Sequence, residues 1–255
     1  MPVCAKRQTV LMVAGLALLA VSVPAAARVP QFEPGEKASV RAVLDGGTVT
    51  LSDGRSVVLV GIAVPRGRQP FADKAKSALE KMLVGREVEL RYAGNRVDRH
   101  GRVLTQLFIG KRWVEGEMLN RGLARVESAA DNRTGIADML AREAKARRAR
   151  RGLLRDGYYA VRRAEEAGRF AESFQLVEGR LIAVGHAEGA VFLNFAEDWH
   201  RGFSLRLAPE TVRLFRAEGI DPAALTGKRV RVRGFIHGSE RPTIDITHPE
   251  QIERQ

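Results

Sequence analysis

Hydrophobic and polar positions alternate in three short runs between residues 38 and 64, and turn sequences interrupt the alternation at residues 45–47 (DGG) and 52–55 (SDGR). Asp-Gly and Gly-Gly pairs between alternating runs are typical of tight hairpins, because such turns need residues that tolerate a positive φ. The pattern therefore predicts a meander of three short strands.

The spacing of apolar residues becomes helical between residues 70 and 84, with Pro70 at the start and Gly85 after the end. Proline suits the first turn of a helix, and glycine suits the position that follows its last turn. This stretch therefore predicts an amphipathic helix. The pattern beyond it predicts strands at 87–93 and 103–109, a short helix at 117–121 and a strongly basic helix at 137–151.

A second strand-rich stretch begins at Phe174. Five strands with one helix between the third and the fourth are typical of a small OB-type β-barrel. Short apolar strands also build sandwiches, so that alternative stays open. The chain as a whole is predicted to be mainly β with helices, an α+β fold. The predicted elements are strands at 174–185, 190–195, 203–208, 229–238 and 243–248 and a helix at 209–219.

Residues 1–27 have the layout of a secretory signal peptide: a basic start, an uncharged apolar run from Val10 to Val23, and small residues up to Ala27. The apolar run is shorter than the roughly 20 residues of a membrane-spanning helix, although a retained anchor is the alternative. Cleavage after Ala27 removes Cys4, the single cysteine of the chain. We expect an exported protein, periplasmic or secreted, with no stable membrane span after cleavage.

The 255 residues carry a formal net charge of +12. The basic excess lies in residues 36–127 (net +6) and 128–170 (net +5), whereas residues 171–255 have a net charge of −1. A basic surface attracts polyanions, so nucleic acid or another polyanion is an expected partner. For the helix predicted at 137–151, a solvated charged face and direct contact with phosphates both stay open.

Four segments, taken in order, resemble the staphylococcal nuclease-like (thermonuclease) family: VRAVLDGGTVTLSDGRSVVLVGIAVP, FADKAKSALEKMLVGREVEL, VDRHGRVLTQLFI and WVEGEMLNRGLARVE. The resemblance covers about residues 36–157 and implies an OB-type barrel with packed helices in a bacterial protein. The predicted division of the chain is a signal peptide (1–27), a nuclease-like domain (36–157), a basic helical linker (158–172) and an OB-like β domain (173–255).

The resemblance implies a calcium-dependent phosphodiesterase, with carboxylates that hold the ion, a glutamate that orients water and two arginines. A hard cation needs several oxygen ligands, water needs a base, and charge developing on phosphate needs fixed donors. Gly47 and Ala63 stand where the family has metal-binding aspartates. Arg66 replaces the general-base glutamate, and Val58 replaces one arginine. Only the second arginine is kept, as Arg102.

These substitutions predict a domain that has lost hydrolysis, needs no cofactor and binds nucleic acid, another polyanion or a protein partner. The alternative is an active secreted phosphodiesterase that cleaves DNA or RNA with calcium at an altered metal site. A cell-envelope protein that meets acidic lipid or polysaccharide is a third interpretation. None of the histidines has metal-ligand spacing with another histidine or with cysteine, so we expect no histidine metal site.

Arginines on two loops are the predicted nucleic-acid-binding residues, because guanidinium groups fit phosphate oxygens in a bidentate way. Tyr92 is the aromatic residue placed to stack on a base. In the last third, the aromatic residues are interpreted as core, with Asn194 and Trp199 as the binding candidates and a protein partner as the alternative ligand. The arginines are Arg66, Arg68, Arg96, Arg99 and Arg102.

Overall fold

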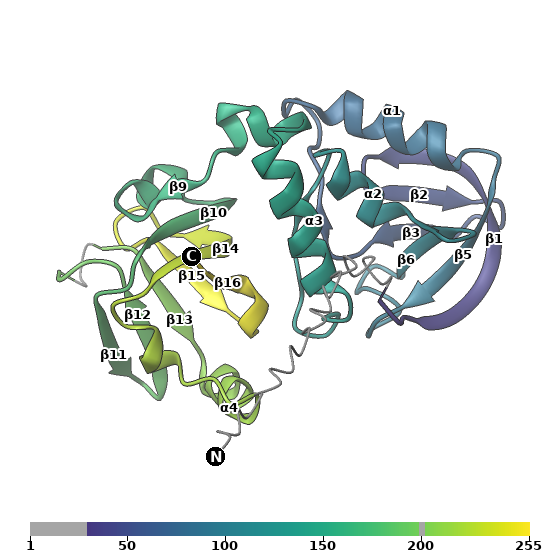
Figure 1. The fold of residues 1–255 in the computed structure, drawn as a ribbon. Helices are drawn as coiled ribbons and strands as arrows, with labels where there is room; N and C mark the ends of the chain where they lie inside the picture. The colour runs from purple at the N-terminus through teal and green to yellow at the C-terminus, as the bar shows by residue number, and fades with distance from the viewer. Residues whose placement is uncertain (1–29, 199–201) are drawn as a thin grey trace, which may run out of the picture.

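A computed structural model describes residues 30–198 and 202–255 as two sheets, each with its own hydrophobic core, with the helix α3 (Ile136–Arg148) between them (Figure 1). The predicted signal peptide, residues 1–27, and the candidate Trp199 lie outside the described residues. Within the two described ranges, none of the helices combines the length and the apolar character that crossing a membrane requires.

The first sheet contains β1 (Glu33–Asp45), β2 (Thr48–Leu51), β3 (Ser56–Leu59), β5 (Glu87–Tyr92), β6 (Val103–Ile109) and β7 (Arg112–Trp113). Five of these strands form a closed barrel: antiparallel pairing runs β3-β2-β1-β5-β6, and parallel pairing of β3 with β6 closes the ring. Alternation explains the strands, since Val88, Leu90 and Tyr92 of β5 are buried and the residues between them are partly exposed. This OB-type α+β fold confirms the prediction for this part of the chain.

Helices pack against this barrel and complete its core. The helix α1 (Ala72–Leu83) buries Ala75, Leu79, Met82 and Leu83 on one face. It ends before Gly85, whose φ of 73° lies in the region that favours glycine. The helix α2 (Val114–Asn120) begins earlier than the predicted 117–121, because Val114 and Met118 are buried one turn apart. Two short strands, β4 (Ile62–Ala63) and β8 (Arg125–Val126), pair with each other.

The second sheet has the strand order β11-β12-β13-β15-β14-β10-β9, with β16 paired to β14. Each of the five predicted strand runs forms a strand, and the first run is split into β10 and β11; β9 and β16 were not predicted. The helix α4 (Pro209–Ala217) lies where a helix was predicted. That this unit is an OB-like barrel stays a prediction. The strands are β9 (Arg162–Arg163), β10 (Ser173–Arg180), β11 (Ala183–Ala187), β12 (Ala190–Asn194), β13 (Ser204–Leu207), β14 (Arg229–His237), β15 (Thr243–Ile246) and β16 (Ile252–Arg254).

The segment after α3 differs from the basic helical linker predicted at 158–172. It contains short 3-10 helices and the strand β9, which pairs in parallel with β10. Ala164 and Ala167 are buried in the second core, so this segment packs with the second sheet instead of bridging through solvent. The 3-10 helices of the chain are η1 (Gly152–Arg155), η2 (Gly157–Tyr159), η3 (Ala164–Phe170), η4 (Pro222–Leu225) and η5 (Pro249–Gln251).

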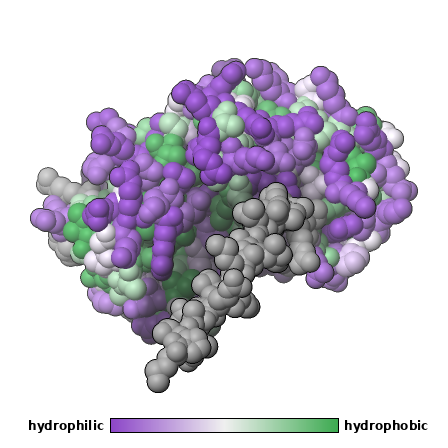
Figure 2. Space-filling model, viewed as in Figure 1, coloured by the Kyte–Doolittle hydropathy of each residue, from purple (hydrophilic) through white to green (hydrophobic). Residues whose placement is uncertain are grey.

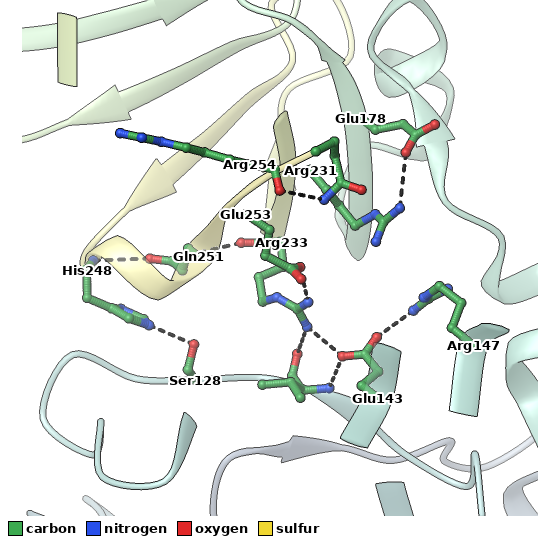
Figure 3. A network of polar contacts seen from close by, with 12 residues as sticks. Ser128, Glu143, Arg147, Glu178, Arg231, Arg233, His248, Gln251, Glu253 and Arg254 are labelled. Atoms are coloured by element: carbon green, nitrogen blue, oxygen red, sulfur yellow. Dashed lines mark hydrogen bonds and ion pairs between the residues drawn. The ribbon is translucent and has the colours of Figure 1, made fainter. Parts of the chain in front are cut away.

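Buried charges connect the second sheet to α3 and β8 (Figure 3). Arg233 of β14 donates to the backbone oxygen of Val126 at 2.9 Å and pairs with Glu143 of α3 at 2.8 Å. The side chains of Arg233 and Glu143 are 3% and 2% exposed. Burial on its own raises the pKa of Glu143, but Arg233 and Arg147 outweigh burial and lower it. The network therefore holds a charged carboxylate between the two sheets.

A second set of polar contacts fixes the segment between β8 and α3. Arg133 pairs with Glu218 at 2.5 Å and with Glu250 at 2.7 Å, and both glutamates come from the second half of the chain. The Oγ of Ser128 lies 2.7 Å from Nε2 of His248, which is fully buried. Side chains from the part of the chain that forms the second sheet thus hold this segment through Ser128 and Arg133.

Candidate functional site

The positions that match the family's motifs converge on one region of the first barrel. Gly47 follows β1, and its backbone oxygen accepts a hydrogen bond from the backbone N–H of Leu59 at 2.9 Å. Thr48 of β2 lies opposite Val58 of β3. The parallel pairing of β3 with β6 sets Val58 opposite Leu104, two residues after Arg102. The barrel therefore brings these segments together, as a shared site requires.

Hydrocarbon fills the space beside the first substituted position. A Cβ on Gly47 would lie 3.0 Å from Cγ2 of Val64, and one on Gly46 would lie 3.3 Å from the Cβ of the same valine. Val64 is buried and belongs to the core of the barrel. An apolar side chain thus packs beside residue 47, the position at which the resemblance predicts a metal-binding carboxylate.

Asp45 is the carboxylate that remains in the turn, and its oxygens already have partners. Oδ1 accepts a hydrogen bond from the backbone N–H of Gly47 at 2.8 Å, as aspartate commonly does in a turn. Oδ2 lies 3.6 Å from Nε of Arg66, the residue that the resemblance aligns with the general base. The carboxylate therefore stabilises the turn and faces a cation of its own chain.

These residues do not fit a calcium ion. Calcium takes six to eight oxygen ligands, of which carboxylates supply the charge. Gly47 and Ala63 have no side-chain oxygen, and within the described ranges no three His, Cys, Asp or Glu side chains lie close enough together to hold a metal ion. Arg66, a cation, occupies the position of the base. The two positions that the resemblance assigns to metal-binding aspartates therefore supply no side-chain oxygen, and the position that it assigns to the base carries a cation.

Glu127 is a charged residue near this site that sequence reasoning missed. It follows β8, and its backbone N–H donates to the backbone oxygen of Gly61 at 3.0 Å. Burial raises the pKa of Glu127, although the charges of Arg66 and Arg125 act in the opposite direction. The available signal was an acidic residue directly after a short β-rich run, RVE, within the matched segment.

Arg102, the kept arginine, is held by its own loop. Its Nε donates to Oδ2 of Asp98 at 2.7 Å, and its backbone N–H donates to Oδ1 at 2.9 Å. Burial tends to raise the pKa of Asp98, but the hydrogen bonds from Arg102 and His100 prevail and lower it to about 2. The aspartate is therefore ionised over the whole physiological range and offsets the charge of Arg102.

The other predicted binding arginines differ in whether a carboxylate of the protein already pairs with them. Arg96 pairs with Glu33 and lies over the ring of Tyr92 at 4.4 Å. Arg99 donates from Nε to Nε2 of His100 at 3.1 Å. Arg68 is exposed, and its guanidinium makes no hydrogen bond or ion pair with the residues that the structure describes. Of the predicted set, Arg68 and Arg99 are therefore the arginines without a carboxylate partner in the described ranges.

Two further binding candidates, Tyr92 and Asn194, are buried. The prediction that Tyr92 stacks on a base is wrong, because its ring is 4% exposed and its hydroxyl donates to Glu36 at 3.0 Å. Asn194 of β12 is 7% exposed, between its strand neighbours Ala183 and Ser204. The described part of the site therefore presents guanidinium groups, and Tyr92 lies beneath one of them.

Known proteins match part of the chain that forms this barrel. Residues 56–156 match the family described as Staphylococcal nuclease homologue. The thermonuclease of Staphylococcus intermedius is 29% identical over 102 residues, 36% of this chain and 61% of that protein. The thermonuclease of Staphylococcus hyicus is 28% identical over 94 residues, 33% of this chain and 56% of that protein.

A third protein shows a similar local match. The protein described as "Uncharacterized 38.1 kDa protein" in Capnoides sempervirens is 34% identical over 95 residues, 37% of this chain and 27% of that protein. The chain covers less than two thirds of the length of each of these three relatives. The family match spans β3, β5 and β6 of the five-stranded barrel together with α1, α2 and α3, so residues 56–156 form a staphylococcal nuclease-like domain.

Proposed function

We propose that this chain is an exported protein whose nuclease-like domain binds nucleic acid and does not hydrolyse it. One observation carries the proposal: the buried side chain of Val64 packs where a carboxylate on residue 47 would begin. The remaining carboxylate of the turn, Asp45, faces Arg66. The lack of side-chain oxygens on Gly47 and Ala63 argues against hydrolysis through a metal-bound phosphate, whereas guanidinium groups still favour phosphate.

The test is a cleavage assay on the full chain with labelled single-stranded and double-stranded DNA and with RNA, in calcium, in magnesium and in chelator. We expect no cleavage above that of Arg102→Ala, which controls for a contaminating nuclease. Binding of the same DNA at low salt, weakening steeply as salt rises, is the expected positive result. No binding at low salt would overturn the proposal.

Cleavage that stops in chelator and in Arg102→Ala supports the alternative, an active phosphodiesterase with an altered metal site. The kept Arg102 is the observation in favour of that alternative. Such a result would mean that Asp45 and Glu127 hold an ion in an arrangement other than the one described.

We also propose that export follows from residues 1–27, with cleavage after Ala27 and a periplasmic or secreted destination. The support is the order of a basic start, an apolar run and small residues in the sequence. Amino-terminal sequencing of protein recovered outside the cytoplasm tests it. A first residue other than Arg28, or recovery of the intact chain in the cytoplasm, would contradict it.

A further inference from the structure

Positive charge is concentrated where α3 ends. Residues 144–163 contain eight basic residues and one acidic residue, Asp156. They form the end of α3, then η1, η2 and β9. In Figure 2, hydrophilic side chains predominate over the top of the molecule, where α3 ends in the view of Figure 1.

Most of these basic side chains are unpaired, in contrast to those of the barrel site. Arg147 pairs with Glu143, and Arg162 lies over the ring of Phe170 at 3.9 Å. The remaining side chains contact no carboxylate among the residues that the structure describes. We call them, together with Tyr158, the α3-tail surface; the basic members are Lys145, Arg148, Arg150, Arg151, Arg155 and Arg163.

Two residues of the α3-tail surface line a hollow. Lys145 and Arg151 line it together with Arg121, Glu117 and Asn120, and its volume is about 480 Å³. Arg121 is paired with Glu117 at 2.6 Å, so these two charges cancel. Arg151 donates to the backbone oxygen of Asn120 at 3.0 Å, which fixes its direction without neutralising it. Two uncompensated cations therefore face a space that admits a phosphate group.

Tyr158, which belongs to η2 in the same stretch of chain, is an exposed aromatic residue. Tyr158 is 50% exposed, and its ring packs at 4.8 Å against the edge of Tyr159. Tyr159 is buried, and its hydroxyl donates to the backbone oxygen of Pro70 at 2.7 Å. The supporting ring is therefore fixed to the loop that carries Arg68. Tyr158 is held in place with part of its surface free, as a base-stacking residue must be.

We propose that a single strand of nucleic acid binds along the α3-tail surface, with its phosphates on the unpaired cations and one base on Tyr158. This inference rests on the proposed function, that the chain binds nucleic acid. Unpaired cations supply sequence-independent attraction to phosphate. A free ring adds stacking, which needs a base released from a duplex and gives preference for single strands.

The experiment measures fluorescence anisotropy of a labelled single-stranded oligonucleotide, and of its duplex, on the full chain across a salt series. Lys145→Gln/Arg150→Gln/Arg155→Gln removes three unpaired cations. It is expected to weaken binding of both probes and to reduce the slope of log K against log salt by about 2 for the single strand. Arg213→Gln/Arg216→Gln/Arg241→Gln removes equal charge from exposed positions of the second unit and is expected to leave the slope unchanged.

Tyr158→Ala separates stacking from charge. It is expected to weaken single-strand binding by about fivefold to a hundredfold, with little effect on duplex binding or on the salt slope. Unchanged circular dichroism and Tm show that each variant is folded. Equal weakening of both probes by Tyr158→Ala would overturn the single-strand assignment.

The outcomes also separate this inference from the proposed function. A wild-type chain that binds no oligonucleotide at low salt overturns both the proposed function and the inference. Vesicles containing phosphatidylglycerol are a second probe, and binding to these vesicles without binding to any oligonucleotide has the same consequence. A wild-type chain that binds, while the α3-tail triple variant binds equally well, overturns the inference alone. Loss of binding in Arg68→Gln/Arg99→Gln would then place the strand at the barrel site.

Discussion

Glu115 is a buried carboxyl group that forms no ion pair with any residue that the structure describes. It lies on α2 with 0% exposure, and the backbone N–H of Leu107 donates to its two oxygens at 3.0 and 3.2 Å. Burial raises its pKa from 4.5 to about 8, although the hydrogen bonds act in the opposite direction. The folded protein therefore holds a proton here that the unfolded chain releases at much lower pH.

This proton makes stability depend on pH. The stability that Glu115 contributes is fully present below pH 4.5 and is lost as pH rises through about 8, at about 1.4 kcal/mol per pH unit. Glu115→Gln keeps an acceptor for Leu107 and cannot ionise. We expect the variant to lose less free energy of unfolding than the wild type between about pH 5 and pH 8.5. Urea titrations at both pH values measure this difference; an identical pH dependence would contradict the raised pKa.

At the scale of elements, the turn between β1 and β2 packs closely against Val64, the residue that follows β4. A Cβ on Gly47 would lie 3.0 Å from Cγ2 of Val64, closer than most real contacts of this kind. We expect Gly47→Asp to lower the free energy of unfolding by about 1–3 kcal/mol, because the valine must shift. The cost should be smaller in a Val64→Ala background, and a double-mutant cycle in urea measures the difference. Additive effects would show that the two positions do not compete for space.

The periodic spacing of apolar residues predicted the strands and helices well, because burial in the core sets that spacing. The alternation of EVELRY predicts β5, and the same alternation puts Tyr92 inside, a signal that its interpretation as a stacking residue overlooked. The pairing of Arg102 with Asp98 depends on side-chain directions within a loop, which spacing does not encode. The approach of Glu127 to Arg66 depends on the pairing of β4 with β8, two strands of two residues each. Such short strands have too few residues to show a period.

At the scale of the whole molecule, the buried pair of Arg233 and Glu143 joins the second sheet to α3, whose residues Ile136 and Met139 pack in the first core. Removing one partner of a buried pair leaves the other charge without compensation. We expect Arg233→Met to lower the free energy of unfolding by about 3–5 kcal/mol. Arg229→Met is the matched control on the same strand, because Arg229 is 61% exposed and pairs with Glu178; we expect about 1 kcal/mol or less.

Scanning calorimetry and urea titration measure both variants. A second, separate transition in Arg233→Met would show that the pair couples the unfolding of the two sheets. Equal effects of Arg233→Met and Arg229→Met would contradict the role given to the buried network.

The same network constrains the order in which the chain folds. Arg233 and Glu143 are 90 residues apart in sequence, and Arg133 and Glu250 are 117 apart. Contacts of such long range form late and slow the completion of folding. Before β14 docks, Glu143 has only Arg147 and the backbone N–H of Val126 as partners, so the carboxylate on α3 lacks the compensation that Arg233 supplies. Folding is complete only after β14 and the residues up to Glu253 have docked on that helix.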